Sequence, residues 1–299
     1  MSTTQLQRVM TRMLFDPELA RAVYEDPARA LRGVDLTAEE RALLTRPDPR
    51  RWRADAERPH RALEGLLAHL PVTLALRATL GGEPAELLEF FGSEAFHEAI
   101  MSRALLAGAF AGWLTRLSPL REAAWGAALA ALEVSCAELR AAPLSAAERA
   151  AAAPPRGVSP HTPTRLSPRA RLLWLPEGCV ERLESARAAL APLSPLAPLS
   201  PLPLGEEERA ALCAPREALA GVGREGVLLE RAGALGEVAT VGVSALPPAL
   251  AALLARAAEG GSLGELWALV EEAGLSPEEA REVVLGLFED GLVLLAPAP

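Results

Sequence analysis

The sequence predicts an all-helical N-terminal bundle followed by a winged-helix-like domain that contains a small antiparallel sheet. Helical periodicity runs almost unbroken through residues 5–140, where helix-start signals recur. The composition then shifts to Ala, Pro, Ser and Arg, and β-rich runs and three short helices follow. We therefore expect a helical bundle domain at 1–142, a Pro-rich linker at 143–168 and a winged-helix-like domain at 169–299.

Length and composition indicate a two-domain globular protein. The chain has 299 residues, half of them hydrophobic, which is enough for two cores. The first residues have a helical period broken by Arg8 and Arg12, unlike the continuous apolar stretch of a signal peptide. No apolar run reaches the roughly eighteen residues of a membrane-spanning helix. We expect a cytoplasmic protein that has no membrane partner.

Helix-start signals define the elements of the first domain. Asp16-Pro17 and Asp26-Pro27 each combine an N-cap residue with a proline in the first turn, and Thr37 begins a Thr-x-x-Glu capping box. Nearly all-apolar segments farther along predict helices buried in a bundle. The last of these helices is expected to run from Pro119 to Arg140, with Ser118 as its cap.

The densest basic patch of the chain lies between Arg46 and Arg61, where six arginines surround Trp52 and His60. This basic patch has three interpretations: a solvated helix face, a surface for a protein partner, or a nucleic-acid contact. Arginine beside an aromatic residue is typical of protein-interface anchors. The candidate residues for contact with a partner enzyme are Arg50, Trp52, Arg53, His60 and Arg61.

Extended structure opens the second domain. Four X-Pro pairs exclude helix before residue 168, and the run ARLLWLP then predicts a strand. A helix follows. The tract at 191–204, APLSPLAPLSPLPL, predicts an extended polyproline loop, or alternatively a ligand for an SH3-like partner. The runs GVLLERAG and GEVATVGVS, separated by a glycine-containing stretch, predict a hairpin.

Three short helices and a terminal strand are predicted between Ala245 and Ala296. Ser262 and Ser276 each precede a glutamate by three residues, so each predicts a capping box. Apolar residues at helical spacing give the second and third helices one apolar stripe each. Helix, helix and strand in this order are typical of a winged helix.

No catalytic or metal-binding motif is found in the sequence. A GxGxxG pattern begins at Gly221, but a helix precedes it and a strand follows, the reverse of the order that a dinucleotide site needs. The four histidines are scattered, and no GxSxG motif occurs. The cysteines Cys136, Cys179 and Cys213 lack disulfide or metal spacing and are expected to be buried. We therefore expect no metal, no cofactor and no catalysis by this chain.

The closing helices are strongly acidic. Residues 259–290 hold nine acidic residues and one basic residue, Arg281, within a chain whose net charge is −9. A winged helix that reads DNA needs Lys or Arg at the phosphates, so nucleic acid is disfavoured as a partner. A winged-helix DNA-binding transcriptional regulator is the alternative function.

The predicted hairpin beside the third helix could instead accept an extended peptide as an added strand. Backbone pairing would give affinity, and side chains of the hairpin and helix would give specificity. For Val284 and Phe288, burial in the core is the competing interpretation. The candidate peptide-binding residues are Val227, Leu228, Leu229, Glu230, Val238, Thr240, Val241, Arg281, Val284, Leu285 and Phe288.

The order of these elements resembles a known family. The strand RLLWLP, the hairpin VLLERAG…GEVATVGVS and the closing segments LPPALAALLARAAEGGSLGELWALVEEAG and GLFEDGLVLLA are similar to the partner proteins of multinuclear non-haem iron-dependent oxidases that modify ribosomally made peptides. The resemblance is strongest over residues 165–296. The first hundred residues are similar more loosely, and also resemble small helical domains that accompany ring-cleaving dioxygenases. The PLSPLAPLSPLP insertion departs from the family pattern.

The resemblance implies a non-catalytic accessory subunit. Its C-terminal part would hold the leader segment of a precursor peptide, and its helical part would contact a cytosolic iron-dependent oxidase, with the iron in that partner. The acidic helices favour a leader that carries basic residues. A free-standing enzyme with a pocket assembled from the scattered histidines is the other rival hypothesis.

Overall fold

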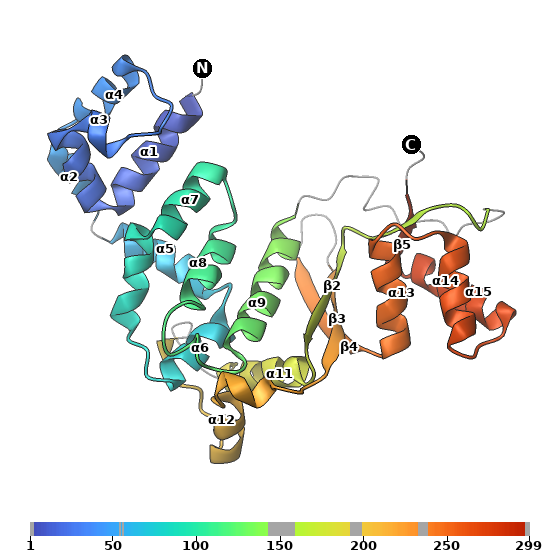
Figure 1. Ribbon diagram of the computed structural model, residues 1–299. Coiled ribbons are helices and arrows are strands. Elements are labelled where there is room, and N and C mark those ends of the chain that lie inside the picture. The colour runs from blue at the N-terminus through green and yellow to red at the C-terminus, as the bar shows by residue number, and fades with distance from the viewer. Residues whose placement is uncertain are drawn as a thin grey trace. The chain divides into compact units, whose positions relative to one another are not determined.

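The computed structural model describes residues 3–53, 55, 57–142, 159–191, 199–232 and 239–296. These residues form helices and small antiparallel sheets, which confirms the predicted combination of a helical N-terminal part with a small sheet (Figure 1). The chain divides into two compact units. The first unit contains Met1–Ala130 and Ala186–Pro215, and the second contains Ala131–Ser185 and Arg216–Pro299.

The first unit is helical. The helices α9 (Gly126–Ala141) and α11 (Cys179–Leu190) each continue from one unit into the other. The remaining elements of this unit are α1 (Thr3–Phe15), α2 (Pro17–Glu25), α3 (Pro27–Ala30), α4 (Ala38–Thr45), η1 (Pro49–Arg53), α5 (Arg58–Leu67), α6 (Pro71–Thr79), η2 (Pro84–Gly92), α7 (Glu94–Ser102), α8 (Leu106–Leu114) and α12 (Glu206–Leu212).

The helix starts predicted at Asp16, Asp26 and Thr37 are confirmed. The Asp16 carboxylate accepts hydrogen bonds from the backbone N–H groups of Glu18 and Leu19 at 3.0 and 2.9 Å. Thr37 forms both halves of a capping box with Glu40. These bonds satisfy N–H groups that have no partner inside the helix, and so they fix where each helix begins.

The helix expected from Pro119 begins instead at Gly126, so that prediction was wrong. The chain makes turns between α8 and α9, and the N–H of Ala124 donates to the carbonyl of Ala214 at 2.8 Å. A backbone N–H that is used by a distant residue cannot also extend a helix ladder. A Cβ at position 126 would lie 2.5 Å from the carbonyl oxygen of Leu120, so this tight turn needs a glycine.

Residues 186–215, which we expected in the second domain, belong to the first unit. Leu202 is buried there, and its N–H donates to Oγ1 of Thr79 at 2.8 Å. Most of the proline-rich tract, residues 192–198, lies outside the described residues. Contacts between residues this far apart leave no trace in local composition, which explains the difference from the expected boundary.

The second unit contains two small sheets. Strands β2 (Ala170–Pro176), β3 (Arg224–Ala232) and β4 (Thr240–Leu246) form an antiparallel sheet in the order β2-β3-β4. The strand ARLLWLP and the hairpin are therefore confirmed. The other elements are β1 (Thr164–Leu166), η4 (Arg216–Leu219), α13 (Pro248–Ala258), α14 (Leu263–Glu272), α15 (Pro277–Glu289) and β5 (Val293–Leu295).

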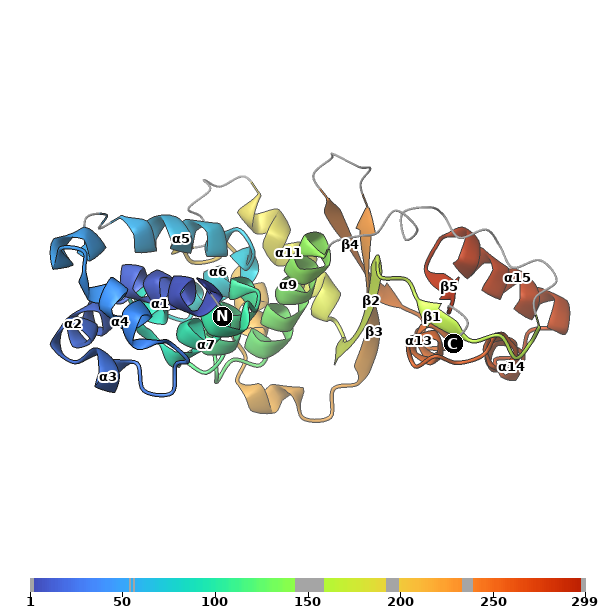
Figure 2. The ribbon, with the colours of Figure 1, turned by 90° about the horizontal axis from the view of Figure 1, so that it is seen from above.

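Part of the predicted linker is a strand. Residues 143–158 lie outside the described residues, but β1 pairs with β5 in antiparallel register, and both strands lie beside α13 (Figure 2). The N–H of Thr164 also donates to Gly261 at 2.8 Å. The three X-Pro pairs among the described residues, between 159 and 168, lie outside helices, and extended backbone with free hydrogen-bonding groups can complete a distant strand.

The two faces of the three-stranded sheet pack against different elements. Leu172, Leu228 and Leu246 lie on one face, within the core that α13, α14 and α15 share. We call this the α13 face. On the opposite face, Val227 and Leu229 are fully buried. Arg171 of that face forms an ion pair with Glu138 of α9.

We expect Gly226→Ala to lower the free energy of unfolding by about 1–3 kcal/mol, because overpacking forces neighbouring elements to shift. A Cβ at position 226 would lie 2.4 Å from Cβ of Ala251 on α13. Gly242→Ala is the matched control, since its nearest neighbour would be a carbonyl oxygen at 3.8 Å. Urea unfolding compares the two variants. Equal stabilities would show that α13 does not depend on this close approach.

Candidate functional site

Strand β4 is an edge of the three-stranded sheet. The strand order places β3 in the centre, so β4 pairs only on one side among the described residues. Its sequence, TVGVSAL, contains no charged residue and no proline. Edge strands that lack such residues can pair with another chain, because alternate N–H and C=O groups point outward. Of the two edges of this sheet, β2 and β4, the β4 edge therefore has the features of a strand that can pair with another chain.

The predicted peptide-binding residues of the hairpin fall into two groups. In β3, Val227 and Leu229 are 0% exposed and Leu228 is also buried, so these side chains form core rather than a peptide contact. The sequence predicts a contact at these positions because an apolar run looks the same on a central strand and on an edge. Glu230 and Thr240 are exposed, Val241 is half-buried, and Val238 lies outside the described residues.

The candidates on α15 divide in the same way. Phe288 is 1% exposed, and it shares a core with Val284 and Leu228, so burial is the correct interpretation of the apolar stripe at these positions. Leu285 is half-buried. Arg281 is exposed, with its guanidinium carbon 5.6 Å from the centroid of the Trp267 ring, within cation–π range.

The acidic residues between 259 and 290 are all exposed. Two of them cap helices: a hydrogen bond from Arg256 and one from the Ser262 backbone lower the pKa of Glu265 to about 2, and the Ser276 backbone N–H lowers the pKa of Glu279. Among the described residues, seven have no ion-pair partner, namely Glu271, Glu272, Glu278, Glu279, Glu282, Glu289 and Asp290. This surface attracts basic groups and repels phosphates.

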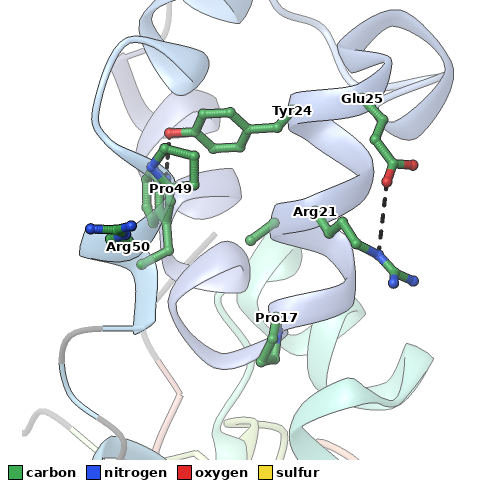
Figure 3. Close-up of a pocket in the computed structure, with 8 residues that line it drawn as sticks. Pro17, Arg21, Tyr24, Glu25, Pro49 and Arg50 are labelled. Carbon is green, nitrogen blue, oxygen red and sulfur yellow. Dashed lines mark hydrogen bonds and ion pairs between the residues drawn. The ribbon is translucent and has the colours of Figure 1, made fainter.

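A separate pocket of about 300 Å³ lies in the first unit, between α2 and η1. Its apolar walls are Pro17, Ala20, Tyr24, Pro49 and Trp52. Figure 3 shows Arg21 and Glu25 on the α2 side, joined by an ion pair, and Pro49 and Arg50 on the η1 side.

The structure brings together two of the five predicted enzyme-contact residues. Arg50 and Trp52 both line the pocket, whereas His60 and Arg61 are exposed on α5, with Arg61 paired to Asp55. The side chain of Arg53 lies outside the described residues. Sequence reasoning missed the α2 wall, although its members Pro17, Ala20 and Tyr24 follow the spacing of one helix face.

One half-buried polar cluster links three segments of the first unit. His97 Nε2 lies 3.3 Å from Asp16 Oδ2, and its Nδ1 lies 3.2 Å from Nη2 of Arg12. Burial opposes ionisation of Asp16, but hydrogen bonds from His97 and from the α2 backbone outweigh it and lower the pKa. These contacts join α1, the N-terminus of α2 and α7, while Arg12 Nε is a buried nitrogen that has no hydrogen-bond partner among the described residues.

Among the described residues, no group of three or more His, Cys, Asp or Glu side chains could hold a metal ion. Burial raises the pKa of Cys179 to about 12, which keeps its thiol protonated and unsuited to nucleophilic attack. Gly226 of the GxGxxG pattern lies within β3 rather than at a helix start. Within the described ranges, no helix is long and apolar enough to cross a membrane.

Comparison with known proteins gives no assignment. No family model matches the chain. No curated protein matches it either.

Proposed function

We propose that this chain is a non-catalytic partner subunit that binds a ribosomally made precursor peptide and presents it to a cytosolic iron-dependent oxidase. The observation that supports peptide binding is the edge of β4, which pairs on only one side among the described residues and contains no charge and no proline. The identity of the modifying enzyme comes from the resemblance of residues 165–296 to oxidase partner proteins. The partner supplies the iron and the oxygen chemistry, and this chain supplies proximity.

Strand addition at β4 has defined requirements. The peptide backbone would pair with the outward N–H and C=O groups of β4, while its side chains alternate between the two faces. Gly242 and Ser244 lie on the α13 face, and Val241 and Val243 on the opposite face.

The negative charge of α14 and α15 would make peptide binding selective for basic leader segments. The acidic surface of α14 and α15 belongs to the same unit as β4, and it favours a leader segment with Lys or Arg. The helices α13, α14 and α15 with β5 would correspond to the helices and one wing strand of a winged helix, with β1 as the partner of that strand. A DNA-reading role for α15 is disfavoured because its exposed charges are mainly carboxylates.

The test uses the leader peptide of a short gene adjacent to the gene for this chain and to that of an iron oxidase. We expect the full-length chain to co-purify with the oxidase and to bind the fluorescein-labelled leader in a polarisation assay. Strand addition uses the N–H of every second peptide residue. One of two peptides, N-methylated at odd or at even positions, should therefore bind at least tenfold more weakly than the other.

The two binding assays test strand addition and the accessory-subunit role separately. Equal weakening by both N-methylated peptides would exclude strand addition. Absence of binding to both the leader and the oxidase would overturn the proposed function as a whole.

A further inference from the structure

We propose that the pocket between α2 and η1 is an anchor site for one apolar side chain from an acidic segment of the partner protein. The identification of that partner as the oxidase rests on the proposed function. The chemistry of the pocket does not, because it follows from the lining residues, their hydrogen bonds and their charges.

The floor of the pocket has no unsatisfied polar group on its aromatic residues. The Tyr24 hydroxyl donates to the carbonyl of Pro47, and Trp52 Nε1 donates to that hydroxyl at 2.9 Å. Both rings are therefore held in place by their own polar atoms and present only apolar surface to a ligand. Together with Pro17, Ala20 and Pro49, they form a rigid apolar cavity. Such aromatic positions lose little conformational entropy on binding, which is typical of interface anchors.

The size of the pocket restricts its occupant. Sites for cofactors and drug-sized ligands occupy about 300–1,000 Å³. At about 300 Å³ this pocket lies at the lower limit. It fits a single leucine, methionine or phenylalanine side chain better than a nucleotide or flavin. A side chain of a protein segment is consequently the occupant that the volume favours.

Charge at the rim determines what flanks that side chain. On the α2 side, Arg21 forms ion pairs with both Glu18 and Glu25, so these three side chains together carry one negative charge and leave no free cation among the described residues of α2. On the η1 side, Arg50 is exposed and has no ion pair among the described residues; the nearby Asp48 carboxylate accepts from the Arg50 backbone N–H at 2.8 Å.

Arg46 and Arg51, which are also exposed, are close to Arg50 in the sequence and add positive charge to this segment. An Asp or Glu beside the apolar anchor would therefore pair with Arg50.

The experiment compares Arg50→Glu with Arg29→Glu in the full-length chain. Both arginines are exposed and lack ion pairs among the described residues, but only Arg50 lines the pocket. We expect Arg50→Glu to weaken oxidase binding at least tenfold and Arg29→Glu to change it less than twofold. Binding of the leader peptide should be unchanged in both variants. Retained oxidase affinity in Arg50→Glu, with leader binding intact, would overturn the anchor site and leave the proposed function standing.

A second measurement does not depend on the oxidase. The indole N–H signal of Trp52 is followed by NMR during titration with acetylated hexapeptide amides of sequence Asp-Glu-Leu-Phe-Glu-Asp, Asp-Glu-Ser-Ser-Glu-Asp and Lys-Lys-Leu-Phe-Lys-Lys. Only the first should shift the signal, and Arg50→Glu should abolish that shift. Equal shifts with the serine or lysine peptide would overturn the proposal. So would an Arg50-dependent self-association of the chain in sedimentation, because it would make a second copy the occupant.

Discussion

Replacing Phe288 with alanine is expected to lower the free energy of unfolding by about 3–5 kcal/mol, because a fully buried aromatic ring leaves a cavity that surrounding residues fill only in part. Phe288 is among the largest fully buried side chains and lies in the core shared by α13, α14, α15 and the sheet. Hydrogen exchange of the α13–α15 amides reports on this unit by itself. We expect faster exchange throughout these helices in the variant.

The control for this prediction is Val283→Ala on the same helix. Val283 is 37% exposed, so its truncation should change the stability by less than about 0.5 kcal/mol. The comparison also separates two roles for Phe288. Lost peptide binding with unchanged hydrogen exchange would show that Phe288 contacts the peptide directly. The alternative outcome is that Phe288→Ala destabilises the unit, whereas Leu285→Ala leaves the protein stable but weakens peptide binding. That outcome would assign the peptide contact to the half-buried Leu285.

Local features of the fold are predictable from the sequence because they depend on a few neighbouring residues. The capping boxes at Ser262 and Ser276 need only a serine and a glutamate three positions apart, and both form. The strand at Ala170–Pro176 is likewise predicted by a short apolar run that ends at proline. The acidic surface is predictable for a different reason: unpaired glutamates are too costly to bury, so their exposure follows from their number.

Nonlocal features are not predictable in the same way. The pairing of β1 with β5 joins segments about 130 residues apart. The sequence of β1, TRL, contains no signal that identifies VLL of β5 as its partner, and the reverse also holds. The position of the candidate peptide-binding strand within the sheet is also a nonlocal feature. An apolar run cannot distinguish the central strand β3 from the edge β4, because the order of strands depends on tertiary packing.

The pocket likewise depends on a nonlocal contact, the hydrogen bond between Trp52 and Tyr24. Sequence reasoning identified the η1 side of the pocket through its arginines. It could not identify the helix that faces it.

The aromatic cluster of the first unit gives the other large expected effect, in Phe90→Ala. Phe90 is fully buried, and its ring centroid lies 5.0–5.6 Å from those of Phe91, Phe96, Phe110 and Trp113. Truncation should lower the free energy of unfolding by about 3–5 kcal/mol, because it creates a cavity and also removes the favourable ring contacts, each worth about 0.5–1.5 kcal/mol.

Phe90→Leu separates the two contributions to this loss. Leucine restores most of the volume without the ring, so it should lose less than about 1.5 kcal/mol if packing dominates. Urea unfolding followed by near-UV circular dichroism, which reports on ordered aromatic side chains, measures both variants. A leucine variant as unstable as the alanine variant would mean that the ring contacts, rather than the filled volume, stabilise this core. The helices η2, α7 and α8 would then depend on aromatic geometry that no other apolar residue can supply.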